Sequence, residues 1–317
     1  MLTRRMAILG ALLAAAGRAA AYPARQVTIV VPFAPGGSAD SLARIIGGDL
    51  GDRLGATVII ENRGGGGGVI GLTTVSRADS GGQVLGIGAT GAIAINPHVA
   101  GAPRFDPLTQ LKPIAKLVDI PLVLIASPAS GLKTIDDVVK ASKASPAGLN
   151  CASTGPNSSQ HLSIELLRAK AGANLVHIPY KGSAPANTGV LSGEVPLGCV
   201  DLAVANEHIK AGTLVAIGVT AAQRYAVVPD IPTFAEQGLA GFDMPGWIGL
   251  FGPPGLADDL ADELSRTLKA GLADASVVTR IAQLVCSPGY LDPAAFRQYV
   301  VAQSALMKTL VAAAEGK

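Results

Sequence analysis

The chain has few aromatic residues and few cysteines, and it has no excess of positive charge once its N-terminal segment is set aside. Aromatic residues make up 4% of the 317 residues, and there are three cysteines. Removal of residues 1–21 would take away Arg4, Arg5 and Arg18 but no acidic residue, so Lys plus Arg falls from 25 to 22 against 23 Asp plus Glu. A net charge of about −1 excludes the basic footprint of a protein that binds nucleic acid.

Catalytic and metal-binding patterns are also missing from the sequence. It contains no Gly-x-Ser-x-Gly nucleophile elbow, and its four histidines have no neighbouring ligand at a spacing typical of a metal site. The acidic residues Asp40, Asp201 and Glu207 stand apart from one another and form no evident acid–base pair. We therefore predict a binding protein that is not an enzyme and that has no metal and no cofactor.

The three cysteines leave two interpretations open. Cys151 and Cys199 each lie in an expected strand, while Cys286 precedes a Ser-Pro-Gly turn. One disulfide and one free thiol would suit an exported protein. Three buried free thiols are favoured, because a disulfide across neighbouring strands rarely meets the required geometry.

The first 21 residues have the layout of a secretory signal peptide. Two arginines precede an apolar run over residues 6–16, and three alanines ending at Ala21 offer a cleavage site before Tyr22. The paired arginines leave twin-arginine export open beside the general secretory route. The apolar run is shorter than the roughly 20 residues that a membrane span needs. We expect the protein to be exported and cleaved near Ala21.

Strand and helix patterns alternate from Val27 onward, which predicts α/β layers built on parallel sheets with crossover helices. Strands are expected at residues 27–32, 57–61, 84–88, 122–127, 149–153, 175–179, 195–200 and 215–220. Helices are expected at residues 39–54, 69–78, 135–143, 158–171, 184–192, 256–273 and 293–314. Thr134 and Asp137 suggest a capping box at the start of the third helix.

No repeat or disordered linker separates two independent domains. We expect the chain to cross into a second lobe near Pro121 and to return near Thr220. The first lobe is then discontinuous, with residues 22–121 and 221–317, and the second lobe has residues 122–220. Two lobes joined by two crossings form a hinge, and the cleft between them is the expected ligand site.

The stretch VTIVVPFAPGGSAD, residues 27–40, predicts an anion site. A strand that ends at a tight glycine turn and restarts as a helix leaves the first N–H groups of that helix unpaired, with the positive end of the helix dipole behind them. Gly36 and Gly37 let a ligand approach without a Cβ in the way, and Ser38 is a good N-cap. A carboxylate is the expected ligand.

Two further strand-to-helix turns are candidate sites. Residues 152–161, ASTGPNSSQH, gather hydroxyl and N–H groups, although an ordinary polar helix cap is the alternative interpretation. If this turn faces the first one across the cleft, the two helix N-termini can hold both ends of a dicarboxylate. In residues 177–183, HIPYKGS, Tyr180 offers a hydroxyl and Lys181 a charge, but a lysine in this setting is more often a solvated loop residue.

The rival hypothesis is a nucleotide-dependent oxidoreductase that uses the loop from Gly64 to Gly71. Residues 66–71 satisfy Gly-x-Gly-x-x-Gly, follow an expected strand and precede an expected helix. The next strand, ending near Gly88, carries no acidic residue to hold a ribose, and five consecutive glycines fit almost any glycine spacing. We therefore favour a binding protein. Trp247, the single tryptophan, suits core or interlobe packing at least as well as a place in the cleft wall.

With these motifs in view, the chain from Tyr22 onward resembles the extracytoplasmic solute receptors of tripartite tricarboxylate transporters, the Bug family. The matching segments include YPARQVTIVVPFAPGGSADSLAR, VIIENRGGGGGVIG, FDPLTQLKPIAKL, LNCASTGPNSSQHLSIELL, VHIPYKGSAPA, VPDIPTFAEQG and GWIGLFGPPG. The resemblance implies a periplasmic binding protein fold of the second type, an α/β fold whose two lobes close by a hinge on an interlobe ligand cleft. It implies a monomeric periplasmic receptor that binds a small carboxylate and presents it to a large and a small membrane subunit.

The resemblance also implies which residues bind the ligand. The first carboxylate loop corresponds to Phe33, Ala34, Pro35, Gly36, Gly37 and Asp40, and the loop after the third strand to Ala89 and Thr90. The second-lobe loop corresponds to Ser153, Thr154, Gly155, Asn157, Ser158, Ser159 and His161, and the Tyr-Lys-Gly turn to Tyr180, Lys181 and Gly182. Asp201 stands where many members carry an acid, although the segment that follows it departs from the family pattern. A sensory receptor without a transporter is a third hypothesis.

Overall fold

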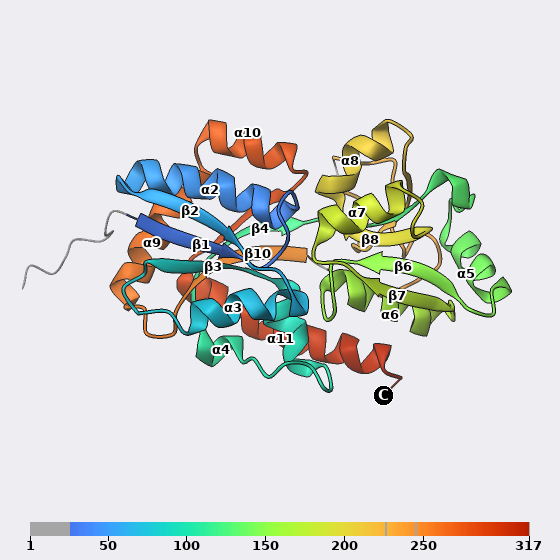
Figure 1. Ribbon diagram of the computed structural model, residues 1–317, viewed down its shortest axis with the longest axis horizontal. Coiled ribbons are helices and arrows are strands. Elements are labelled where there is room, and N and C mark those ends of the chain that lie inside the picture. The colour runs from blue at the N-terminus through green and yellow to red at the C-terminus, as the bar shows by residue number, and fades with distance from the viewer. Residues whose placement is uncertain (1–25, 226, 245, 317) are drawn as a thin grey trace, which may run out of the picture.

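The computed structural model describes residues 26–225, 227–244 and 246–316, so the expected signal peptide lies outside the described residues. The chain forms two α/β lobes side by side, each built around its own sheet (Figure 1). Among the described residues, no helix has both the length and the apolar character needed to span a membrane.

The first lobe contains a six-stranded mixed sheet in the order β11-β4-β10-β3-β1-β2. Its strands are β1 (Gln26–Val31), β2 (Thr57–Asn62), β3 (Val84–Ala89), β4 (Lys112–Ile120), β10 (Gly246–Gly252) and β11 (Ser287–Leu291). Its helices are α2 (Ser38–Leu54), α3 (Val69–Ser76), α4 (Pro107–Gln110), α9 (Asp258–Leu272), α10 (Ala275–Gln283) and α11 (Pro293–Ala314). Three short turns, η1 (Gly66–Gly68), η2 (Gly91–Ile95) and η3 (Asn96–His98), complete it.

The second lobe contains a five-stranded sheet in the order β7-β6-β8-β5-β9. Its strands are β5 (Leu122–Ala126), β6 (Leu149–Ser153), β7 (Leu175–Pro179), β8 (Leu197–Asp201) and β9 (Val215–Val219). Its helices are α5 (Ile135–Ala144), α6 (Ser159–Ala171), α7 (Ser183–Leu191) and α8 (Leu202–Lys210), with one turn at η4 (Pro128–Ser130). The capping box expected at α5 is present, because Thr134 and Asp137 each bond the other's backbone N–H.

The expectation of purely parallel sheets is wrong. β5 pairs antiparallel with β8 and β9, and β10 pairs antiparallel with β3 and β4. The reason is the path of the chain, which runs straight from β4 into β5 and later returns as β10, so that these strands enter each sheet from the other lobe. All eight expected strands and seven expected helices are present, with ends shifted by two residues at most.

The elements that the sequence analysis missed have weak local signals. In β4, Lys112, Lys116 and Asp119 interrupt the apolar pattern, and β10 carries three glycines in seven residues. α8 and α10 are short, with nine residues each. Only the pairing of β4 and β10 with neighbouring strands reveals them as central strands.

The segment between β9 and β10 stays with the second lobe. Phe234 N donates to the carbonyl of Val219 at 3.1 Å, and Met244 N donates to the carbonyl of Thr220 at 2.9 Å. We therefore propose that the chain returns to the first lobe after Met244, later than the position near Thr220 expected from the sequence.

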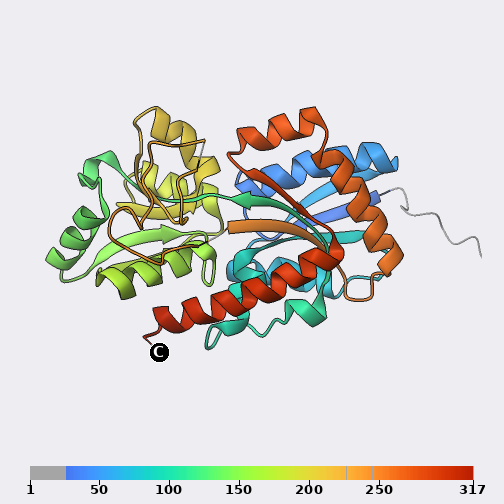
Figure 2. The ribbon, with the colours of Figure 1, turned by 180° about the vertical axis from the view of Figure 1, so that it is seen from behind.

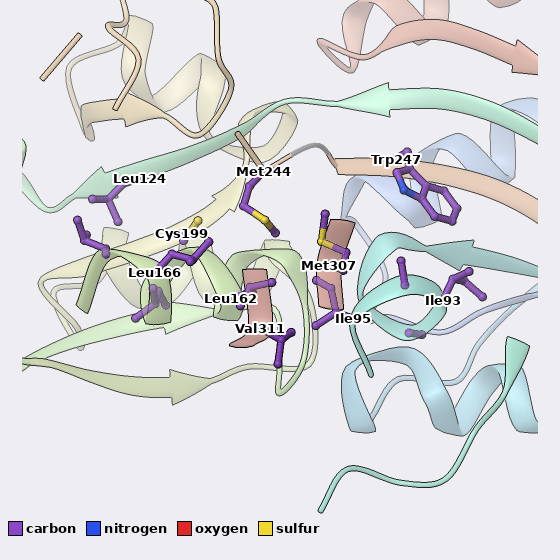
Figure 3. Close-up of a cluster of buried hydrophobic side chains, with 14 of the residues drawn as sticks. Ile93, Ile95, Leu124, Leu162, Leu166, Cys199, Met244, Trp247, Met307 and Val311 are labelled. Atoms are coloured by element: carbon purple, nitrogen blue, oxygen red, sulfur yellow. The ribbon is translucent and has the colours of Figure 1, made fainter. Parts of the chain in front are cut away.

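The C-terminal helix α11 links the two lobes. It packs against β4 in the first lobe and against α6 in the second, and Figure 2 shows it running from one lobe to the edge of the other. The buried side chains of Met307 and Val311 on α11 belong to one apolar cluster with Leu162 of α6 and Ile95 of η2 (Figure 3). The cysteines Cys151, Cys199 and Cys286 are buried and free.

Candidate functional site

A small cavity, about 50 Å³ in volume, lies where the two lobes meet. Eight of the residues expected at the ligand site line it: Phe33, Gly37, Ala89, Thr90, Thr154, Ser158, Ser159 and Asp201. The lining also includes residues outside the expected set, among them Ser38, Ala39, Gly67, Gly91, Gln160, Ser183, Gly246 and Trp247. Ile120, Leu122 and Ile248 supply apolar wall. Both lobes thus contribute to this site.

Four of the described helices begin at this cavity: α8, whose N-cap is Asp201, and three helices that line it with residues of their first turn. Gly37 is the N-cap of α2, Ser158 is the N-cap of α6, and Gly182 is the N-cap of α7. The first residues of all three helices line the cavity: Ser38 and Ala39 on α2, Ser159 and Gln160 on α6, and Ser183 on α7. Helix N-termini carry partial positive charge and free N–H groups, so together they favour an anion in the cavity.

The loop before α2 is held by an acid that does not itself line the cavity. Gly36 has φ +83°, in the left-handed region that favours glycine, and its N–H donates to Asp40 Oδ2 at 2.9 Å. Asp40 also pairs with Arg44 at 2.9 Å and accepts from Asn62 at 3.0 Å. Burial alone would raise the pKa of Asp40, but the hydrogen bonds from Arg44, Gly36 and Asn62 outweigh it and hold that pKa below its usual value. The geometry therefore gives Asp40 a role in positioning the loop.

A chain of hydrogen bonds orders the floor of the cavity in the second lobe. Thr154 Oγ1 donates to Gln160 Oε1 at 2.9 Å, and Gln160 Nε2 donates to Asp201 Oδ1 at 2.6 Å. The backbone N–H of Asp201 donates to Ser183 Oγ at 2.8 Å. Thr154, Gln160 and Ser183 thereby fix the carboxylate of Asp201 at the cavity wall.

Asp201 is the only ionisable side chain among the described residues that line the cavity. Its burial raises the pKa to about 6, and the hydroxyls of Ser38 and Ser183 with the Gln160 amide limit that rise. No lysine, arginine or histidine is among these lining residues. The positive potential of the cavity therefore comes from backbone N–H groups and helix ends.

Two buried polar atoms in the cavity wall have no hydrogen-bond partner among the described residues. They are Ser38 Oγ and Trp247 Nε1, and each residue is 1% exposed. The Ser38 hydroxyl lies close enough to Asp201 to lower the pKa of that carboxyl, but the two groups do not have the geometry of a hydrogen bond. A buried donor left without a partner costs about 1–3 kcal/mol. Both residues line the cavity, and a ligand or water inside it can satisfy the Ser38 hydroxyl. The Trp247 ring packs edge-on against Phe296 and Tyr299 of α11.

The Tyr-Lys-Gly turn meets the first loop outside the cavity. Ala34 N donates to the carbonyl of Lys181 at 2.8 Å, and a Cβ on Gly182 would lie 3.3 Å from Ala34 N. The hydroxyl of Tyr180 lies over Gly189 on α7. Pro35 and Gly36 are exposed. Ala34, Lys181 and Gly182 bring the two lobes together at the rim. None of them lines the cavity, and neither do Tyr180, Pro35 and Gly36.

The remaining expected residues shape the loop before α6. Ser153 Oγ accepts from Gly155 N at 3.1 Å and shares a hydrogen bond of 2.6 Å with His177 Nε2. His161 stacks on His177 with ring centroids 3.8 Å apart, and its Nδ1 accepts from Asn157 N at 3.1 Å. Burial lowers the pKa of His177 to about 4, so this ring is neutral at pH 7. The histidine pair supports the loop from behind.

Glycines form the closest contacts between the lobes. A Cβ on Gly67 would lie 2.0 Å from the carbonyl oxygen of Pro156, and one on Gly91 would lie 2.8 Å from the carbonyl oxygen of Asn157. Beside them, Asn157 Nδ2 donates to Asn96 Oδ1 across the interface at 3.0 Å. The structure is therefore a closed form, in which the glycine-rich loop packs against the second lobe.

Several cavity residues lacked a clear sequence signal. Gln160 and Ser183 lie inside the two candidate turns, residues 152–161 and 177–183, but neither was among the residues assigned to the ligand site. Trp247 comes from β10, a strand that the sequence pattern did not predict. The backbone N–H of Trp247 donates to Thr90 Oγ1 at 3.0 Å. Its place in the wall depends on the return of the chain from the second lobe.

The model of the "Tripartite tricarboxylate transporter family receptor" matches residues 42–315. The chain belongs to this receptor family. Among curated relatives, it is 32% identical to "Protein BugT" of Bordetella pertussis over 305 residues, covering 94% of each chain. The resemblance to the Bug family stated from the sequence is thereby confirmed.

Several solved structures share the two-lobed fold. The periplasmic binding protein BugD superposes with a TM-score of 0.88 at 34% identity, covering 93% of this chain and 99% of BugD. R. palustris Rpa4515 with adipate gives a TM-score of 0.88 at 29% identity, covering 93% and 98% of the two chains. MatC from Rhodopseudomonas palustris with bound malate gives 0.85 at 29% identity, covering 92% and 100%. The expected two-lobed periplasmic binding protein fold is confirmed.

The family assignment also bears on the oxidoreductase hypothesis. The family is one of receptors, and the loop from Gly64 to Gly71 does not form an open cradle in this receptor. Gly67 instead faces Pro156 of the second lobe too closely for a Cβ to fit. The glycine spacing that resembled a dinucleotide fingerprint thus has a different physical reason, which is close approach between lobes.

Proposed function

We propose that this protein is a periplasmic receptor that captures one small organic acid between its lobes and delivers it to a tripartite tricarboxylate-type membrane transporter. The observation that carries the proposal is the closed cavity at which α2, α6 and α7 begin, with the unpartnered hydroxyl of Ser38 in its wall. Similar proteins solved with adipate and with malate support a carboxylate as the ligand.

The lining residues and the rim residues have different roles in this proposal. The eight expected residues that line the cavity contact the acid or its bridging water, together with Ser38, Gln160, Ser183 and Trp247. The expected residues outside the cavity hold the loops in place, as Asp40 does for the first loop, or join the lobes at the rim, as Ala34 and Lys181 do. The protein acts as a monomer without catalytic residues, and it is exported by a signal peptide cleaved near Ala21.

Binding of acids to the purified protein tests this function. We expect titration calorimetry to give one saturable site for at least one acid from a panel of malate, succinate, aspartate, adipate and lactate. NAD⁺ and NADH should give no heat of binding, because Gly67 leaves no space for a pyrophosphate in the closed form. Binding of the nucleotide without any acid would favour the oxidoreductase instead.

A pair of serine variants locates the site. Ser38→Ala removes an unpartnered donor from the cavity wall and should weaken binding by about tenfold or more, the worth of a hydrogen bond to a charged group. Ser142→Ala is the matched control, because Ser142 lies on α5 away from the cavity and is equally buried. Its hydroxyl donates to the Val139 carbonyl and accepts from Asn174 N. Equal affinities of the two variants would contradict the assignment. Uptake of the labelled acid by cells with and without the receptor then tests delivery to a transporter.

A further inference from the structure

The charge balance inside the cavity restricts the class of acid that fits. The N-termini of α2, α6 and α7 favour an anion, yet the single ionisable side chain among the described lining residues is the acid Asp201. No cationic side chain stands beside it in the wall. One part of the cavity therefore suits a negative group and another part suits a hydrogen-bond donor.

The carboxylate of Asp201 keeps acceptor capacity for a ligand. Oδ1 accepts from Gln160 Nε2 at 2.6 Å, and the hydroxyls of Ser38 and Ser183 are close enough to influence the carboxylate. An ionised carboxylate offers about four acceptor positions on its two oxygens. Because Asp201 is 8% exposed and lies in the cavity wall, a bound molecule reaches these positions before bulk water does.

A second bare carboxylate beside Asp201 is disfavoured. Two like charges in a buried site repel strongly, since the effective dielectric constant there is far below that of water. A hydroxyl or an ammonium group at the same place donates to the free lone pairs of Asp201. An ammonium also balances its charge.

We propose, on the basis of the proposed receptor function, that Asp201 selects organic acids that carry a hydrogen-bond donor, a hydroxyl or an ammonium group, next to the carboxylate held by the helix N-termini. The shared chemistry is donation to Asp201. Hydroxy acids and amino acids supply it, whereas the parent acids without that substituent do not.

The test compares acids that share a carbon skeleton on the unmodified protein. Titration calorimetry at pH 7.5 measures succinate against malate and aspartate, and propionate against lactate and alanine. In at least one of the two series, the hydroxy or the amino acid should bind at least about tenfold more tightly than its parent. A preference for malate or lactate identifies the donor as a hydroxyl, and a preference for aspartate or alanine identifies it as an ammonium.

The variant Asp201→Asn shows whether the preference depends on this carboxylate. The amide is similar in size but carries no charge, so the preference should fall to about threefold or less. A ligand with an ammonium group should lose the most affinity. Asp136→Asn, on the exposed face of α5, is the control and should keep the full preference. Circular dichroism and thermal melting check the fold of both variants.

Three results are decisive. Parent acids that bind as tightly as their substituted partners would overturn the selection by Asp201 while leaving the receptor function intact. A donor preference that Asp201→Asn keeps unchanged would also overturn it, since another group would then be responsible. Failure of every acid to bind would overturn the proposed function itself.

Discussion

At the scale of single residues, the ionised form of Asp201 destabilises the unliganded protein. It is a buried carboxylate with no cation beside it among the described lining residues of the cavity, and burial raises its pKa to about 6 from an ordinary value of 3.8. The folded protein therefore favours the protonated form more than the unfolded chain does. The stabilising contribution of protonated Asp201 is fully present below about pH 4 and is lost as the pH rises through 6.

We predict that Asp201→Asn changes the pH dependence of stability. The difference in free energy of unfolding, wild type minus variant, should fall by about 2 kcal/mol between pH 4 and pH 7, because each unit of pKa shift corresponds to about 1.4 kcal/mol and part of the change lies below pH 4. Urea unfolding of both proteins at several pH values measures this difference. The titration of His177 contributes equally to the free energy of unfolding of both proteins, so it does not affect the difference.

The thiols near Asp201 do not titrate in the pH range of this measurement. Burial raises the pKa of Cys199 well above its usual value and that of Cys286 to about 12, so both thiols stay neutral over this range. A difference in stability that stays constant from pH 4 to pH 7 would show that Asp201 keeps an ordinary pKa.

Residue types at loop positions could be predicted from the sequence, but side-chain directions could not. The PGGSAD segment correctly indicated a glycine turn that opens a helix at the cavity, but the N-cap of that helix is Gly37 and not Ser38 as expected. Asp40 in the same segment points instead to Arg44, Asn62 and the Gly36 N–H, which lies one helical turn earlier in the chain. A linear motif does not show which of two neighbouring polar groups faces inward.

At the scale of elements, the glycine-rich loop and turn η1 control how closely the lobes approach. Gly66 and Gly67 have similar left-handed φ values, +58° and +63°. They differ in their surroundings. A Cβ on Gly66 would lie 3.6 Å from the side chain of Ile70 in the same lobe, whereas one on Gly67 would meet the carbonyl oxygen of Pro156 in the other lobe.

We predict that Gly67→Ala weakens ligand binding by about tenfold or more, because the new methyl group blocks full closure. Gly66→Ala is the matched control: it carries a similar backbone strain of about 1–2 kcal/mol but leaves closure free. Titration calorimetry with the acid that binds the unmodified protein most tightly gives the affinities, and small-angle scattering gives the compaction on binding. If both variants bind and compact alike, the loop is not a closure element.

The elements that the sequence predicted well are those with strong local signals. Buried apolar strands such as β5 and capped amphipathic helices such as α5 are specified by residues within one segment. β4, β10 and β11 could not be predicted in this way, because their apolar pattern is broken by charge, glycine and proline. Their strand state comes from pairing with partners far along the chain.

At the scale of the whole molecule, the connections between the lobes restrict the hinge. The chain passes between lobes at β4 to β5 and again before β10, and α11 packs on both lobes through Met307 and Val311. At the rim, the lobes meet through single hydrogen bonds, such as Ala34 N to the Lys181 carbonyl and Asn157 Nδ2 to Asn96 Oδ1. The rim contacts are therefore expected to separate before the packing of α11 is disturbed.

The two-lobed architecture could be inferred from the sequence, but the way in which the two lobes fit together could not. Alternating strands and helices with a crossing near Pro121 were enough to predict two α/β units and a site between them. The contacts of Gly67 with Pro156 and of Gly91 with Asn157 depend on how the two units fit together. No spacing within either lobe encodes that fit.

The most direct test of the central claim is native mass spectrometry of the full protein after incubation with malate, aspartate, succinate, adipate and lactate together. We predict a complex with one acid per chain, retained in Gly66→Ala and depleted in Gly67→Ala and Ser38→Ala. A spectrum that shows only the unliganded protein, or the same bound acid in all of these variants, would contradict a carboxylate receptor that closes on its ligand at this cavity.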